Sequence, residues 1–330
     1  MREYREYYEE SSSSDKTLWI ILGIVGGVIL LGVLACGGLA FVAVRGMQAG
    51  MAQVAANLQQ QFEDLDLQEE DYAEARRQFK TKLFRQGPTP QQWKPVKLPD
   101  GVQEVEIRSG DLRLKAWVNP PRDAGQRKLA AVLFLHDGWA FGVEDWEMAK
   151  PFRDAGYVVM MPILRGENGQ AGSFSMFYDE VDDALAAADH LSKLPYVDDK
   201  HIYVAGHSEG GTLALLAALT SPRFRAAASF SGSPNQRIFV QTGQQAAPFN
   251  QADPREFEMR SPLAYATSFK CPLRIYYGDQ DFLLIEPSET TATRARTKGL
   301  DVSAVSVQGN QVTALSEAMR QAIQFFKEKQ

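Results

Sequence analysis

The chain has 330 residues, of which 45% are hydrophobic and 23% are charged. These fractions are ordinary for a globular protein that can bury a sizeable core. The net charge of −6, with no cluster of basic residues interleaved with aromatic ones, excludes nucleic acid as an expected partner.

The first marked feature is an uncharged stretch over residues 17–44. About 20 apolar residues suffice to cross the hydrocarbon core of a bilayer, so this stretch predicts a transmembrane helix after an N-terminal tail of residues 1–16. A cleaved signal peptide is an alternative, although its apolar region should be shorter. Residues 33–37 also resemble a loose lipobox, in which Cys36 would be lipidated. Either a span or a lipidated Cys36 would leave the domain that follows tethered to a membrane.

Basic residues on the two sides of the stretch predict its orientation. Arg2, Arg5 and Lys16 precede it, whereas only Arg45 follows closely. Because basic residues prefer the cytoplasmic side, we expect the N-terminus in the cytoplasm and the C-terminal part outside it.

Residues 45–95 are predicted to form a helical stalk or linker. Apolar residues recur there at steps of three and four, at Met51, Val54, Leu58, Phe62 and Leu65. Glycine and proline at residues 87–90 end this pattern, so the main domain is expected over residues 96–330.

The main domain is predicted to contain a mostly parallel sheet. Residues 102–107 and 112–118 alternate as a hairpin does, and a helix is expected around residues 146–155. Apolar runs of strand length follow at residues 129–135, 157–162, 202–205, 226–230, 273–277 and 302–307. Unbroken apolar runs separated by helices indicate strands that are covered on both faces.

A candidate nucleophile lies between a predicted strand and a predicted helix. Residues 206–210 read Gly-His-Ser-Glu-Gly, which places Ser208 where a strained turn would expose its hydroxyl group. The alternative is that Ser208 only caps the helix.

The loops after two other predicted strands are expected to supply partners for Ser208. The backbone N–H groups of Glu209 and of either Gly138 or Trp139 would form an oxyanion hole. Asp281 would be the acid, with Asp279 as a turn-capping alternative.

Together these motifs resemble the α/β-hydrolase superfamily, and within it the prolyl oligopeptidase (peptidase S9) catalytic domain and the dienelactone hydrolases. The resemblance covers about residues 96–330. It rests on His136-Asp137-Gly138, residues 165–169, residues 206–210, residues 261–262 and 270–273, and Gly278 with Asp281. It implies an α/β-hydrolase fold and the cleavage of an ester or peptide-like bond in a small-molecule substrate.

The sequence departs from this family at the expected histidine. Gln311 follows the last predicted strand where the histidine should stand, and none of the four histidines comes after Asp281. An amide cannot accept the serine proton near neutral pH. The alternatives are that His136 acts as a displaced base, or that the chain is a catalytically silent binding or scaffold protein.

No metal cluster or dinucleotide motif is visible, so no metal or cofactor is expected. Residues 236–260 are a candidate cap over Ser208.

Overall fold

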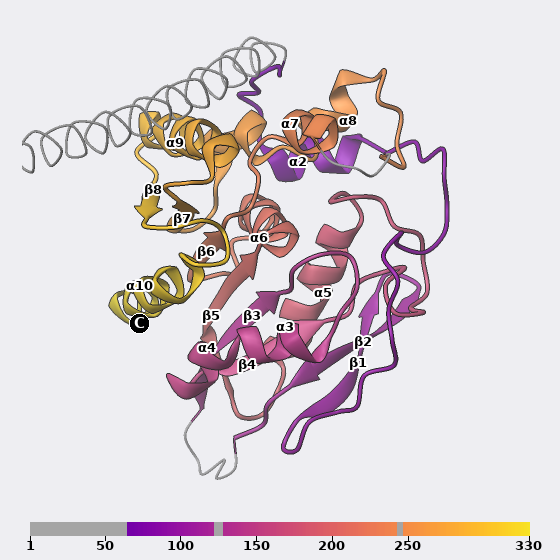
Figure 1. Ribbon diagram of the computed structural model, residues 1–330, viewed down its shortest axis with the longest axis vertical. Helices are drawn as coiled ribbons and strands as arrows, with labels where there is room; N and C mark the ends of the chain where they lie inside the picture. Colours follow the sequence, from indigo (N-terminus) through magenta and orange to yellow (C-terminus); the bar gives the residue numbers. More distant parts are fainter. Residues whose placement is uncertain (1–64, 122–127, 243–246) are drawn as a thin grey trace, which may run out of the picture. The chain divides into compact units, whose positions relative to one another are not determined.

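The computed structural model describes residues 65–121, 128–242 and 247–330 (Figure 1). The predicted membrane span and the first part of the predicted stalk lie outside these residues. Within the described ranges, no helix is both long enough and apolar enough to cross a bilayer.

The described residues build an eight-stranded sheet whose order is β1-β2-β4-β3-β5-β6-β7-β8. β1 and β2 form an antiparallel hairpin, β2 pairs antiparallel with β4, and the other pairs are parallel. The strands are β1 (Gln103–Ser109), β2 (Leu112–Val118), β3 (Leu129–Leu135), β4 (Val158–Pro162), β5 (Val197–His207), β6 (Ala226–Phe230), β7 (Leu273–Gly278) and β8 (Val302–Val307). This arrangement confirms the predicted α/β-hydrolase-like fold with a mostly parallel sheet.

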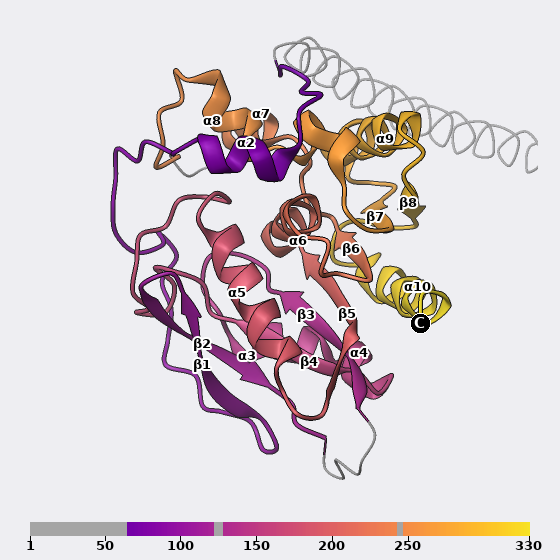
Figure 2. The same cartoon turned by 180° about the vertical axis from the view of Figure 1, so that it is seen from behind.

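Helices cover both faces of the sheet (Figures 1 and 2). On β3, Leu133 and Leu135 pack into one apolar cluster and Val132 and Phe134 into another, because successive side chains of a strand point to opposite faces. The first cluster includes side chains of α5 (Glu180–Ser192), α6 (Glu209–Thr220) and α9 (Phe282–Thr297). The second includes side chains of α3 (Val143–Met148), α4 (Lys150–Asp154) and α10 (Leu315–Glu328). This double burial explains the unbroken apolar runs in the sequence.

The end of the predicted stalk lies against the domain instead of standing apart from it. Among the described residues of this segment, the only helix is α2 (Tyr72–Gln78). Asp71 caps it by accepting a hydrogen bond from the backbone N–H of Glu74. Tyr72 is fully buried in the first apolar cluster, and its hydroxyl group donates to the carbonyl of Met259 at 2.8 Å. Residues 65–95 therefore contribute to the core of the domain.

Two predicted elements differ in length from those observed. The single helix expected around residues 146–155 is two short helices, α3 and α4, which meet at Ala149 just before Pro151. Proline starts a helix readily but cannot continue one, because it lacks a backbone N–H. β5 begins at Val197, earlier than predicted, because the charged residues 198–200 continue the strand beyond its apolar part.

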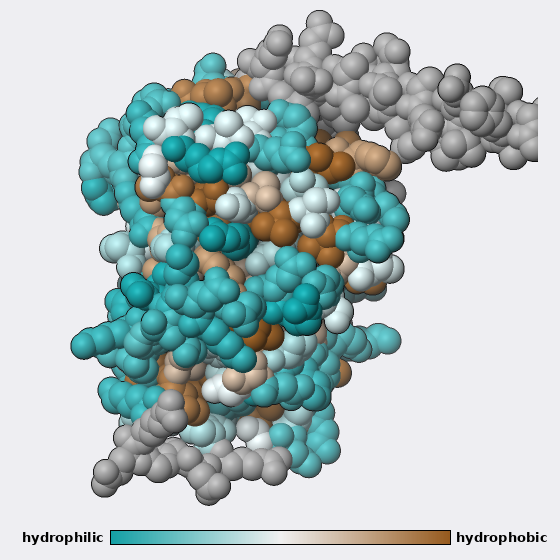
Figure 3. Space-filling view, turned by 90° about the vertical axis from the view of Figure 1, so that its left-hand side faces the viewer, coloured by the Kyte–Doolittle hydropathy of each residue, from teal (hydrophilic) through white to brown (hydrophobic). Residues whose placement is uncertain are grey.

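A short layer over one end of the sheet comes from the connection between β6 and β7. It contains α7 (Gln236–Thr242), α8 (Pro254–Glu258) and the 3₁₀ helix η1 (Pro262–Ser268). The view in Figure 3 shows a face covered mostly by hydrophilic side chains, with apolar side chains in small separate areas.

The order of the strands fixes where a site can form. From β3 the chain passes to β4 on one side, whereas β5 lies on the other side of β3, with Leu135 paired to Gly206. Ligands of open α/β sheets bind at such a switch point, beyond the carboxyl ends of the strands. The loops after β3 and β5 therefore lie together at the expected place of a site.

Candidate active site

Ser208 lies on a strained turn between β5 and α6. Its backbone has φ 50° and ψ −116°, and its N–H donates to the carbonyl of Phe230 at 2.8 Å. A side chain at Gly210 would come within 2.1 Å of the carbonyl oxygen of Leu135, so the turn requires glycine there. This geometry is that of a nucleophile elbow, in which the strain exposes the serine hydroxyl group.

Ser208, Asp281 and Gln311 line one cavity of about 390 Å³. They reach it from the loops after β5, β7 and β8. The other lining residues are Thr212, Ser231, Ser233, Ile238, Phe239, Gln280, Phe282, Leu283 and Leu284. Ile238 and Phe239 belong to α7, so part of the segment 236–260 flanks Ser208.

The two acid candidates make different hydrogen bonds. Asp279 accepts from the backbone N–H of Gly309 at 2.8 Å, which ties the loop after β8 to the end of β7. Asp281 accepts from the backbone N–H of Gly278 at 3.2 Å and faces the cavity of Ser208. Asp279 thus braces the loop after β8, whereas Asp281 lines the same cavity as Ser208.

Gln311 lies beside this cavity but is exposed. Its carbonyl oxygen accepts a hydrogen bond from Nε2 of His207 at 3.1 Å. Within the described residues its side-chain amide makes no hydrogen bond to Ser208 or Asp281. The amide bridge that its chemistry allows is therefore not formed, whereas the backbone of this residue contacts His207.

The oxyanion-hole candidates are both hydrogen-bonded within the chain. The N–H of Trp139 donates to Oε1 of Gln91 at 2.8 Å, and the N–H of Gly138 donates to Oε2 of Glu209 at 3.1 Å. Gly138 adopts φ 66°, a left-handed conformation that favours glycine. Of the two, Gly138 is the donor directed toward the nucleophile, because the hydroxyl group of Ser208 donates to the same Glu209 oxygen at 2.7 Å.

Three ionisable groups surround the serine. Burial and a hydrogen bond to Asp137 raise the pKa of Glu209. Burial opposes ionisation of Asp137, but hydrogen bonds from His207 and Glu209 outweigh it and lower the pKa of Asp137 to about 2. Burial also opposes the charged form of His207, but Asp137, whose Oδ2 is 3.4 Å from Nδ1, raises the pKa of His207. The two carboxyl groups therefore lie close together, and Glu209 ionises less readily than Asp137.

The sequence did not single out the side chains of Asp137, His207 and Glu209 as a group. All three stand inside the motifs, at residues 136–139 and 206–210, where attention goes to the serine and to backbone donors. Three ionisable residues in two loops that meet at a switch point are the signal that could have identified them.

His136 is held away from the serine. Its Nε2 lies 2.9 Å from Oε2 of Glu167, and its Nδ1 lies 2.9 Å from the carbonyl oxygen of Asp137. Burial opposes the charged form of His136, but the Glu167 carboxylate outweighs it and raises the pKa of His136 to about 10. Both ring nitrogens thus donate within the loop, and neither is free to accept a proton from Ser208. His190 lies in the last turn of α5, and His201 lies in the middle of β5, six residues before the last residue of the strand.

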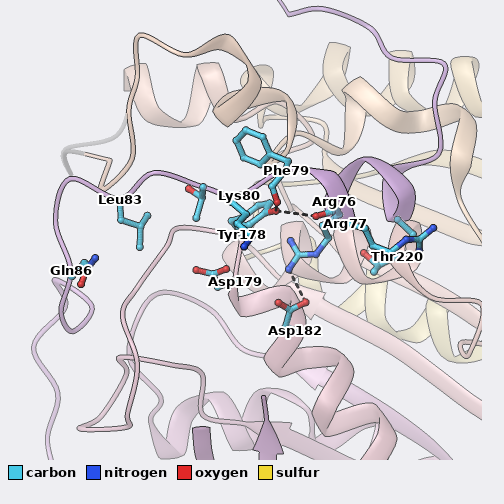
Figure 4. A pocket seen from close by; sticks show the side chains of 12 residues that line it. Arg76, Arg77, Phe79, Lys80, Leu83, Gln86, Tyr178, Asp179, Asp182 and Thr220 are labelled. Atoms are coloured by element: carbon cyan, nitrogen blue, oxygen red, sulfur yellow. Dashed lines mark hydrogen bonds and ion pairs between the residues drawn. The ribbon is translucent and has the colours of Figure 1, made fainter. Parts of the chain in front are cut away.

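A larger cavity, of about 650 Å³, lies between α2 and the start of α5 (Figure 4). Two of its charged side chains, those of Arg76 and Asp182, form an ion pair at 2.7 Å. The hydroxyl group of Tyr178 donates to the carbonyl of Phe79 at 2.8 Å. Ser208, Asp281 and Gln311 do not line this cavity, so it belongs to the junction between α2 and the domain.

Within the described residues, no group of acidic, histidine or cysteine side chains could hold a metal ion.

The comparison with known protein families agrees with the observed fold. The model of the prolyl oligopeptidase family matches residues 143–312, which is more than half of the chain. The uncharacterized peptidase YtmA of Bacillus subtilis is 24% identical over 190 residues, which are 52% of this chain and 70% of that protein.

Solved structures share the fold at low identity. The acylaminoacyl peptidase of Pyrococcus horikoshii has a TM-score of 0.57 and 20% identity, over 69% of this chain and 41% of that chain. An esterase of Pyrobaculum calidifontis has a TM-score of 0.55 and 22% identity, over 71% of this chain and 86% of that chain. The chain thus spans less than half of the acylaminoacyl peptidase but most of the esterase.

Proposed function

The chain belongs to the prolyl oligopeptidase family, and we propose that it hydrolyses an ester or peptide-like acyl bond through Ser208. The observation that carries this proposal is the strained elbow of Ser208, which shares its cavity with Asp281. A strained backbone persists where the surrounding structure maintains it, and it is common at active sites. The solved relatives include proteins named as an esterase and as an acylaminoacyl peptidase, and both names refer to acyl bonds.

The walls of the cavity indicate the kind of substrate. Apolar side chains of α7 and the start of α9 line it, namely Ile238, Phe239, Phe282, Leu283 and Leu284. A volume of about 390 Å³ is within the range of small-molecule sites. We infer a small ester or peptide-like substrate with an apolar group beside the scissile bond.

We further propose that the reaction is slow, because no imidazole serves the serine. Gln311 stands at the histidine position, and His136 and His207 are engaged with Glu167 and Asp137. In subtilisin, removal of the triad histidine lowers kcat by about 10⁶-fold. Ser208 can still act on activated acyl compounds, whose leaving groups need little assistance.

The second candidate is a catalytically silent protein that uses the same fold for binding. The observation that favours it is the Gln311 side chain, which makes no hydrogen bond to Ser208 or Asp281 within the described residues. In that case the cavity would bind an apolar ligand without cleaving it.

We also propose that residues 17–44 anchor the chain in a membrane, with the hydrolase domain outside the cytoplasm. The support is the uncharged stretch and the basic residues that precede it.

Labelling with a fluorophosphonate probe separates the two candidates. The probe transfers its phosphonyl group to a nucleophilic serine with loss of fluoride. We expect slow, stoichiometric labelling of the wild-type protein and none of Ser208→Ala, together with slow hydrolysis of p-nitrophenyl esters. Equal signals from both proteins would reject Ser208 as the nucleophile. No labelling of the wild type, with retained binding of a non-cleavable ester analogue, would favour the silent protein.

A further inference from the structure

The Glu209 carboxyl group lies between two hydrogen-bond donors. Its Oε2 accepts from the backbone N–H of Gly138 at 3.1 Å and from the hydroxyl group of Ser208 at 2.7 Å. The oxyanion hole of this fold uses a backbone N–H from the loop after β3, here that of Gly138, together with the backbone N–H of the residue after the serine, here Glu209.

An acyl substrate requires the same position. When serine attacks a carbonyl, the carbonyl oxygen becomes an oxyanion close to the serine oxygen and within about 3 Å of both donors. The Glu209 oxygen already lies 2.7 Å from Oγ of Ser208 and 3.1 Å from the N–H of Gly138. One oxygen atom fills this space, so the carboxyl group and a substrate carbonyl cannot be bound together.

We propose that the Glu209 side chain is an internal occupant of the oxyanion hole, which a substrate carbonyl must displace before Ser208 can react. The proposal rests on the proposed function, because it concerns the same serine.

The neighbours of Glu209 favour its place in the hole. Its carboxyl group lies close to Asp137, whose Oδ2 is 3.4 Å from Nδ1 of His207. Leaving the hole would break the hydrogen bonds to Gly138 and Ser208, so the occupied state is the resting state of the site.

Two substitutions test this inference. Glu209→Ala removes the carboxyl group but keeps the backbone N–H groups of residues 138 and 209. Glu209→Gln is the matched control, because its amide oxygen can accept the same hydrogen bonds. A net hydrogen bond is worth about 2- to 10-fold in an equilibrium. We therefore expect Glu209→Ala to react with the fluorophosphonate about tenfold or more faster than both the wild type and Glu209→Gln.

Acetate supplies a second readout. Glu209→Ala removes the atoms of one acetate ion, so free acetate should refill the hole in that variant. We expect ¹³C-acetate to broaden in the NMR spectrum with Glu209→Ala and not with wild type or Glu209→Gln. Acetate should also slow the labelling of Glu209→Ala alone, and Ser208→Ala in the same background should abolish that labelling.

The results are interpreted for variants that thermal unfolding shows to be folded, and each result then supports or overturns the proposal. Labelling of Glu209→Ala at or below the wild-type rate, without acetate binding, would overturn the proposal. A loss of labelling in both Glu209 variants would instead identify the carboxyl group as the acceptor of the serine proton. If no protein labels, the proposed hydrolase function fails, and acetate binding alone still decides whether the hole is occupied by Glu209.

Discussion

At the scale of single residues, the site combines a serine on a strained turn with an incomplete set of partners. Ser208 and Asp281 share a cavity, yet the hydroxyl group donates to Glu209 and not to an imidazole. The sequence predicted the elbow and the absent histidine, because both depend on residue types in fixed local motifs. It could not predict the contact of Glu209 with Gly138, because that contact depends on a side-chain rotamer between two loops that are distant in sequence.

Restoring an imidazole at position 311 tests whether the missing base limits the reaction. Gln311 lines the cavity beside Ser208 and Asp281, so a histidine there can reach the serine by rotation of its side chain. We expect Gln311→His to raise the Ser208-dependent hydrolysis of p-nitrophenyl esters by about 10² to 10⁴-fold, within the size of the histidine effect. The gain should appear as pH rises through about 6.5, where imidazole loses its proton.

Gln311→Asn is the control, because it changes the side chain without adding a base. Combining Gln311→His with Glu209→Ala should give the fastest protein, since the two changes act on the base and on the oxyanion hole separately. A wild-type rate already as high as that of Gln311→His would contradict the assignment of position 311 as the missing base.

At the scale of elements, the loops after β3 and β4 are joined by a buried ion pair. His136 and Glu167 are 2.9 Å apart, with 1% and 2% of their side chains exposed, and Glu167 also accepts from the backbone N–H of Leu164. This pair holds the loop that carries Gly138. The prediction that His136 braces the loop agrees with these contacts, and the alternative that it serves as a displaced base does not.

Removing the carboxylate of this pair should destabilise the protein in a pH-dependent way. Folding raises the pKa of His136 from about 6.5 in the unfolded chain to about 10. The contribution of the pair is thus fully present below about pH 6.5 and is lost as pH rises through 10. We expect Glu167→Gln to lower the free energy of unfolding by about 3 kcal/mol near pH 6. Urea denaturation at pH 6 and pH 10.5 measures the difference, which should shrink at the higher pH.

Asp198→Asn provides the comparison, because Asp198 pairs with His201 at 2.7 Å near the surface, with about a third of each side chain exposed. Exposed pairs contribute less than about 1 kcal/mol. An equally large effect of both substitutions, or an effect of Glu167→Gln that does not change with pH, would show that the buried pair does not hold the loop in this way.

The elements themselves were predictable where burial dominates the sequence. β3 and β6 have the predicted bounds, because strands buried between helices contain few polar residues. The contribution of residues 65–95 to the core was not predictable, because Tyr72 finds its partners in η1 and near α8, almost 200 residues later. Local periodicity carries no information on such contacts.

At the scale of the whole molecule, the domain must be considered together with the uncharged stretch of residues 17–44. Those residues lie outside the described part of the chain, and their role stays a prediction. A chain anchored by them should remain with membranes after washing with high salt or carbonate and should be released by detergent. A chain lacking residues 17–44 should appear in the soluble fraction with its hydrolase domain folded.

The basic residues before the stretch, Arg2, Arg5 and Lys16, predict that the domain lies outside the cytoplasm. Protease added to intact cells should therefore digest the C-terminal domain, whereas a tag at the N-terminus should become accessible only after lysis. Recovery of that tag on the membrane-bound chain would exclude a cleaved signal peptide. Loss of membrane attachment in Cys36→Ala would indicate a lipidated cysteine instead of a span. Complete protection of the C-terminal domain would reverse the orientation and place Ser208 in the cytoplasm.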